Sequence, residues 1–176
     1  MQLKTKLSTL ICVVLLLFSC STSKKLNEPF YEENSETNLF VFVGEKISVD
    51  EFDPNQNSEV KIVDSITGDT VIKKTIVMDS GFNCKYRISQ KVFNDLGTDT
   101  VKFKAYDHYG RPPFEKYDYV LLYISKNKDG SYYHQKYQFD PLVRKENNFS
   151  GLKGETIESL FNKKKSTVLT ARGLFK

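Results

Sequence analysis

The 176-residue chain has no tryptophan, only two histidines and only three cysteines. It contains no HExxH motif and no CxxC pair, the usual signatures of a zinc site. A Gly-x-Ser-x-Gly elbow, which would present a serine nucleophile, is also missing. No cofactor and no metal site is therefore expected, and nothing in the sequence assembles a known catalytic constellation.

Long apolar runs are missing as well. The longest, residues 7–18, has about a dozen residues, whereas a membrane-spanning helix needs about 20. Lys4 and Lys6 precede this run and Ser19 and Cys20 follow it, which is the layout of a secretory signal. The first 25 residues therefore predict export from the cytoplasm.

The sequence Leu17-Phe18-Ser19-Cys20 resembles the lipobox of bacterial lipoproteins. This resemblance implies that residues 1–19 are a signal peptide removed by signal peptidase II, and that Cys20 becomes the diacylglycerol-modified, acylated first residue. In Gram-negative bacteria, a residue other than Asp after Cys20 implies sorting to the outer membrane, on a face that the sequence leaves open. An ordinary cleaved signal peptide and an uncleaved anchor are the alternatives.

Cysteine use agrees with a core that has no disulfide. Cys12 lies in the segment to be removed and Cys20 is assigned to the lipid, so Cys84 remains alone. A single thiol cannot form an intramolecular disulfide, and the fold must rely on apolar burial. Because Cys84 alternates with Phe82 and Tyr86, we expect a buried small apolar residue there and not a nucleophile.

Charge gives little reason to expect a nucleic-acid partner. The net charge of +4 falls to about +2 when Lys4 and Lys6 leave with the signal, since no acidic residue leaves with them. Residues 20–37 show no apolar period and predict a flexible tether. Residues 38–176 have the length of a single domain.

Alternation of apolar and polar residues predicts an antiparallel sheet with one buried face. Phe82, Cys84, Tyr86 and Ile88 alternate with polar residues, and residues 100–106 repeat the pattern. Strands are predicted at residues 39–43, 46–52, 59–63, 70–78, 82–89, 100–106, 117–125, 131–139 and 166–171, with residues 140–154 irregular and a helix at 155–162.

These elements predict a mainly β protein, an antiparallel β-sandwich with one short C-terminal helix. The run from Tyr86 to Ser125 resembles the central strands of immunoglobulin-like domains of bacterial surface proteins. That resemblance implies an Ig-like binding module. The C-terminal helix lies outside the pattern, so an α+β arrangement or a small barrel remains open.

The densest polar cluster is Asp107-His108-Tyr109-Gly110-Arg111, where a predicted strand meets a loop. Such a loop can carry a ligand site. Adjacent residues on a strand point to opposite faces, so a catalytic relay between Asp107 and His108 would need the turn to bring them together. Ligand contact, a catalytic centre and a purely structural loop are the three interpretations.

Six tyrosines lie on two strands that we expect to pair: Tyr117, Tyr119, Tyr123, Tyr132, Tyr133 and Tyr137. Exposed, they could bind a sugar or a protein; buried, they would form a tyrosine-rich core. The candidate ligand contacts are Asp107, His108, Tyr109, Arg111, Tyr119, Tyr123 and Tyr133.

The sequence thus favours a lipid-anchored cell-envelope protein with a non-catalytic role. It would bind a protein or glycan partner or serve as an accessory subunit, with its N-terminal lipid in the membrane. One alternative is a small envelope hydrolase centred on Asp107 and His108. The other is an inhibitor or immunity-type lipoprotein.

Overall fold

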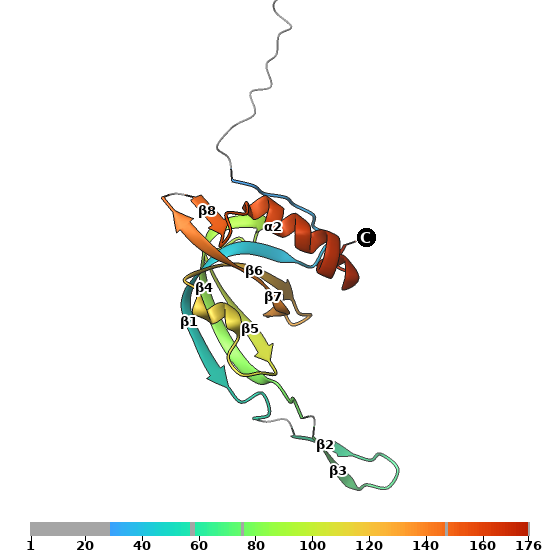
Figure 1. Ribbon diagram of the computed structural model, residues 1–176. Helices are drawn as coiled ribbons and strands as arrows, with labels where there is room; N and C mark the ends of the chain where they lie inside the picture. The colour runs from blue at the N-terminus through green and yellow to red at the C-terminus, as the bar shows by residue number, and fades with distance from the viewer. Residues whose placement is uncertain (1–28, 57–58, 75, 147, 176) are drawn as a thin grey trace, which may run out of the picture.

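The computed structural model describes residues 29–56, 59–74, 76–146 and 148–175, so Cys20 and the predicted signal lie outside the described residues. The fold is mainly β and sandwich-like, with one C-terminal helix, as predicted (Figure 1). The elements are β1 (Phe40–Phe52), β2 (Glu59–Val63), β3 (Thr70–Lys74), β4 (Ser80–Phe93), β5 (Thr100–Asp107), the short 3₁₀ helix η1 (Pro113–Lys116), β6 (Tyr119–Lys126), β7 (Tyr132–Lys145), β8 (Asn148–Gly151), α2 (Ile157–Lys164) and the π-helical turn η2 (Lys165–Leu169).

Six strands form one sheet in the order β5-β4-β1-β6-β7-β8, and its neighbouring strands are antiparallel. The sheet curls until β5 also meets β7, where Lys104 and Tyr133 are partners in a parallel bridge. The two layers are therefore parts of one continuous sheet. An immunoglobulin domain differs in this respect, because its layers are two separate sheets.

The curl is concentrated in β1, whose pairing with β4 shifts register at three places. The sequence predicted two strands separated at Gly44, but the structure has one strand that passes through it. A Cβ at Gly44 would lie 3.0 Å from side-chain carbons of both Leu122 and Tyr86. Glycine therefore lets the strand approach the facing side chains where the sheet bends.

The two faces of β6 enter two different apolar cores. Val120, Leu122 and Ile124 point into the curled sheet, where they meet Phe82, Cys84, Tyr86, Val101, Phe103 and Ala105. Leu121 and Tyr123 point outward and pack under α2 with Ile157, Phe161 and Leu169. Both faces of β6 are therefore buried, and the predicted inward faces of β4 and β5 are confirmed.

The C-terminal segment differs from the prediction in two places. Most of residues 140–151 is strand and not irregular, because β7 continues through Pro141 and pairs with β6 and then β8. The predicted strand at 166–171 is wrong, because the chain stays helical and buries Leu169 beside Phe161. Residues eight apart lie on the same side of a helix, so burial of this apolar stripe overrides the local β propensity.

Part of the predicted tether belongs to the folded body. The backbone of Glu32 exchanges hydrogen bonds with β4, donating to the Val92 carbonyl at 3.0 Å and accepting from the Asn94 amide at 3.1 Å. The Phe30 ring lies 5.9 Å from the Phe161 ring. The domain therefore begins at or before Pro29 and not at residue 38.

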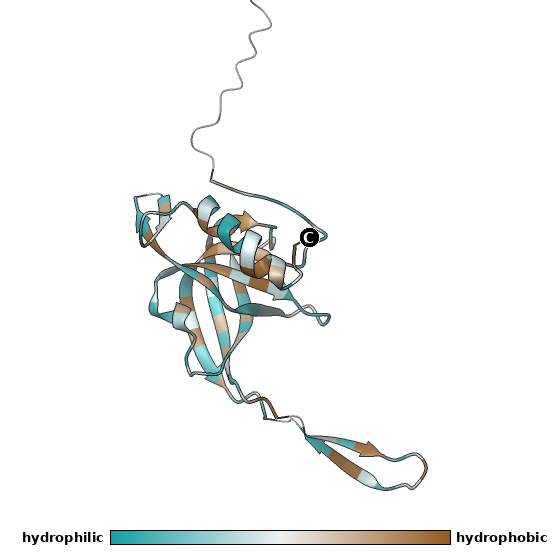
Figure 2. Cartoon of the chain, turned by 45° about the vertical axis from the view of Figure 1, so that its right-hand side comes forward, coloured by the Kyte–Doolittle hydropathy of each residue, from teal (hydrophilic) through white to brown (hydrophobic). Residues whose placement is uncertain are grey.

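The strands predicted at 59–63 and 70–78 are β2 and the shorter β3, which pair as a hairpin and form a separate two-stranded sheet. It projects from the end of the body opposite α2 and the first described residues (Figure 1). Both strands carry hydrophobic residues, and none of the other described elements covers them (Figure 2).

Candidate functional site

The loop after β5 places its polar residues in separate contacts. Asp107 is buried, and its carboxylate accepts a hydrogen bond from the Tyr109 amide at 2.9 Å. The Arg111 guanidinium donates to both carboxylate oxygens of Glu115, at 2.7 and 2.8 Å, and to the Val49 carbonyl. These contacts fasten η1 to β1, so they support the structural interpretation of this loop.

His108 does not pair with Asp107. Its Nδ1 lies 3.3 Å from the carboxylate of Asp79, which also accepts a hydrogen bond from Lys136 at 2.6 Å. The bond from Lys136 holds the pKa of the Asp79 carboxyl below its usual value. Tyr109 is 87% exposed and contacts the His108 ring edge-on. Of the predicted cluster, His108, Tyr109 and Arg111 are exposed, and Arg111 is held by Glu115.

The candidate tyrosines do not form one binding surface. Tyr123 is fully buried under α2 and donates its hydroxyl to Asp140 at 3.0 Å. Tyr119 is half-buried and stacks with Phe149 beside β8. Tyr133, also half-buried, lies at the seam between β5 and β7. The six predicted tyrosines thus divide between the cores, their rims and, for Tyr137, solvent.

Asp140 joins the sheet to the C-terminal helix. Burial raises its pKa, and this outweighs the opposing effects of Lys164, which lies 3.3 Å away, and of the Tyr123 hydroxyl. Lys165 forms an ion pair with Glu32. Both lysines therefore fix the C-terminal helical segment in place.

Among the described residues, the β2–β3 hairpin and the chain just after it carry most of the exposed large aliphatic side chains. Its exposed apolar side chains and those just after it are 46% to 93% exposed: Ile62, Val63, Ile66, Val71, Ile72, Ile76 and Met78. Paired positions put Ile62 opposite Val71 on one face, and Ile72 opposite Lys61 on the other. Both faces thus present apolar side chains to solvent. Sequence analysis predicted the two strands but not that no other described element covers them.

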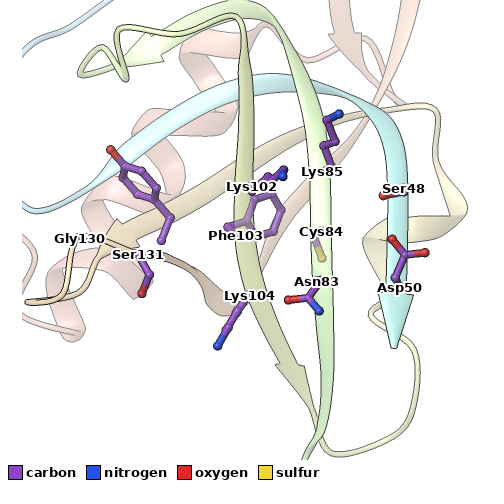
Figure 3. Close-up of a pocket in the computed structure, with 11 residues that line it drawn as sticks. Ser48, Asp50, Asn83, Cys84, Lys85, Lys102, Phe103, Lys104, Gly130 and Ser131 are labelled. Atoms are coloured by element: carbon purple, nitrogen blue, oxygen red, sulfur yellow. The ribbon is translucent and has the colours of Figure 1, made fainter. Parts of the chain in front are cut away.

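An open groove of about 700 Å³ lies on the face of β4 and β5 that points away from the core. Figure 3 shows Lys85 of β4 with Lys102 and Lys104 of β5, beside Asp50 of β1. The β6–β7 turn closes the other side with Tyr132. Sequence analysis placed these lysines on the wet face of two strands but could not show that they share a groove.

Cys84 lines this groove, but its thiol is unreactive. Its side chain is 2% exposed, and burial raises the pKa of the thiol to about 12. A neutral thiol is a poor nucleophile. The structure therefore confirms the expected apolar role of Cys84.

His134, the second histidine, is buried inside the curled sheet. Its Nε2 lies 2.7 Å from the carbonyl oxygen of Gln138, so this nitrogen carries the proton and donates. Its ring meets Phe114 edge-on at 4.7 Å. Burial lowers the pKa of the imidazole to about 4, which keeps His134 neutral near pH 7.

Within the described ranges, no group of three His, Cys, Asp or Glu side chains could hold a metal ion. The same residues include no helix that is both long and apolar enough to cross a membrane. Comparisons with protein families, with curated proteins and with solved structures found no match for this chain.

Proposed function

We propose that the chain is a lipid-anchored, non-catalytic protein of the cell envelope, and that its β2–β3 hairpin binds a protein partner. The lipobox-like sequence ending at Cys20 supports the anchor. The uncovered hairpin is the observation that supports the binding role.

An isolated two-stranded hairpin is only marginally stable in water, and soluble proteins rarely expose contiguous apolar surface. Here Ile62 and Val71 lie opposite one another at 46% and 55% exposure, and Ile66 at the turn is 93% exposed. A protein partner that covers these side chains would bury both faces. This would supply the apolar contacts that the described part of the chain does not give the hairpin.

The edges of the hairpin favour the same conclusion. Among the described strands, β2 and β3 pair only with each other, so each has one unpaired edge. Unpaired edges accept a strand from another chain through main-chain hydrogen bonds, while alternate side chains supply specificity. We therefore propose a partner with an exposed strand that extends the β2–β3 sheet.

A photo-crosslinking amino acid at Ile66 tests the binding role in living cells. We expect one discrete product of fixed mass. Introducing Ile62→Lys with Ile72→Lys should abolish it, because two charges would enter the apolar contact. Leu152→Lys is the matched control, since Leu152 is an exposed apolar residue on the body at 57% exposure. The control should leave the product unchanged.

Equal crosslinking by the hairpin variant and the wild type would refute the hairpin as binding surface. A product made of two copies of this chain would replace the partner with self-association. The anchor is tested separately by intact mass and membrane partition of the wild type beside Cys20→Ala. A wild type without lipid, or a variant that still partitions with the membrane, would refute the lipid anchor.

A further inference from the structure

The geometry points to a second binding site: the groove over β4 and β5 takes an acidic oligosaccharide. This site lies on the body and does not depend on the hairpin. The groove is open to solvent and has a volume of about 700 Å³. Ligand sites commonly occupy about 300–1,000 Å³, so several sugar units fit.

The charge arrangement in the groove is unfavourable for the protein alone. Lys85 and Lys102 are direct partners across the β4–β5 pair. Like charges opposite one another destabilise a sheet. On its other side Lys85 faces Ser48 of β1, a neutral residue. Among the described residues, no carboxylate lies within 4.0 Å of either ammonium group.

The next position on the same face of β4 gives the contrast. Arg87 pairs there with Glu45 of β1, with 3.0 Å between nitrogen and oxygen. The sheet thus gives Arg87 a carboxylate partner, whereas Lys85, two residues earlier on the same face, has the neutral Ser48 as its neighbour on β1. A bound anion between Lys85 and Lys102 would supply the missing charge.

The spacing of the positive charges favours an extended anion. Lys102 and Lys104 are two residues apart on one strand, which is about 7 Å, and adjacent strands are about 4.8 Å apart. Charges spread over such distances suit a chain with one acidic group per unit. No arginine lines the groove, so the bidentate fork that clamps a compact phosphate is missing.

The neutral lining favours a sugar chain over an acidic peptide. The Asn83 amide and the Ser48 hydroxyl lie beside the lysines (Figure 3). Amide and hydroxyl groups can both donate and accept, as sugar hydroxyls require. Tyr132 borders the groove. Its ring packs edge-on against the Phe40 ring, with 5.6 Å between the two ring centroids. A fixed aromatic ring offers sugar C–H groups an apolar contact.

Calorimetry with a hexamer of galacturonic acid tests this site in the full chain, at about 50 mM and about 300 mM salt. We expect binding that weakens at the higher salt. The double variant Lys85→Gln with Lys102→Gln should lose about tenfold in affinity or more, since each exposed charge contact contributes up to about 1 kcal/mol. The neutral glucose hexamer should not bind.

Lys73→Gln with Lys74→Gln removes the same charge from the hairpin and should bind like the wild type. The groove variant should melt at or above the wild-type temperature, because the repulsion between Lys85 and Lys102 is gone. If the double variant unfolds instead, the single variant Lys104→Gln, at an exposed position of the same groove, should show the loss of affinity.

No binding at the lower salt would overturn the inference, and so would equal weakening by the hairpin control. Hexaglutamate or inorganic phosphate binding as tightly as the acidic sugar would overturn the saccharide assignment. Loss of the hairpin crosslink with saccharide binding intact would separate this site from the proposed protein partner.

Discussion

The buried imidazole of His134 makes the stability of this domain depend on pH. Burial lowers its pKa from 6.5 to about 4, and Arg172 and Lys164 oppose the charged form as well. The unfolded chain therefore binds a proton at higher pH than the folded chain. The stabilisation is complete above pH 6.5 and is lost as the pH falls toward 4. The whole effect is about 3 kcal/mol, because each pKa unit corresponds to about 1.4 kcal/mol.

Urea denaturation between pH 7.5 and 4.5 measures this effect. Far-UV circular dichroism is the suitable probe, because the chain has no tryptophan. The free energy of unfolding of the wild type should fall by about 2.5 kcal/mol over this window. His134→Gln should lower stability at pH 7.5, because it changes the packing against Phe114, and should remove most of the pH dependence.

His108→Gln is the matched control, because it removes the exposed histidine and leaves His134 in place. It should retain the wild-type pH dependence. Asp140 acts in the opposite direction: its raised pKa makes the folded form more stable as the carboxyl gains its proton. Asp140 is present in every variant, so comparing the curves isolates His134. Equal slopes for the wild type and His134→Gln would refute this reasoning.

Three substitutions test the packing of the two cores by the same denaturation at pH 7.5. Gly44→Ala should destabilise by about 1–3 kcal/mol, because the new Cβ would enter a tightly filled space. Phe161→Ala should cost about 3–5 kcal/mol, whereas Glu158→Ala on the exposed side of the same helix should cost under about 0.5 kcal/mol. Tyr123→Phe should cost about 1–3 kcal/mol, because Asp140 loses a buried hydrogen bond. An unchanged midpoint in any of the three would contradict the packing described for that residue.

The sequence predicted side-chain burial best where the alternation of apolar and polar residues lies within a single strand. Strict alternation in β4 and β5 predicted which side chains would be buried, because each strand has one face toward the core and one toward solvent. The C-terminal segment misled, because Val168 and its neighbours favour a strand locally. The segment is helical because it packs against the sheet in a way that buries Phe161 and Leu169 together.

The candidate sites were harder to predict because they depend on register. Lys85 and Lys102 belong to strands whose wet faces were predicted, but their direct opposition follows from the β4–β5 pairing. Tyr132 reaches the same groove because the sheet curls and brings β7 to β5. For the loop cluster, a relay between Asp107 and His108 required the turn to bring them together, whereas folding places Asp79 beside His108.

The early start of the domain limits where it can sit if Cys20 carries the proposed lipid. Nine residues, 20–28, separate the lipid from Pro29, and a fully extended chain of that length spans about 30 Å. The α2 end of the body would therefore stay close to the membrane. Since the hairpin projects from the opposite end (Figure 1), it would point away from the lipid surface. The proposed protein partner would then be met on the far side of the domain and not within the anchoring membrane.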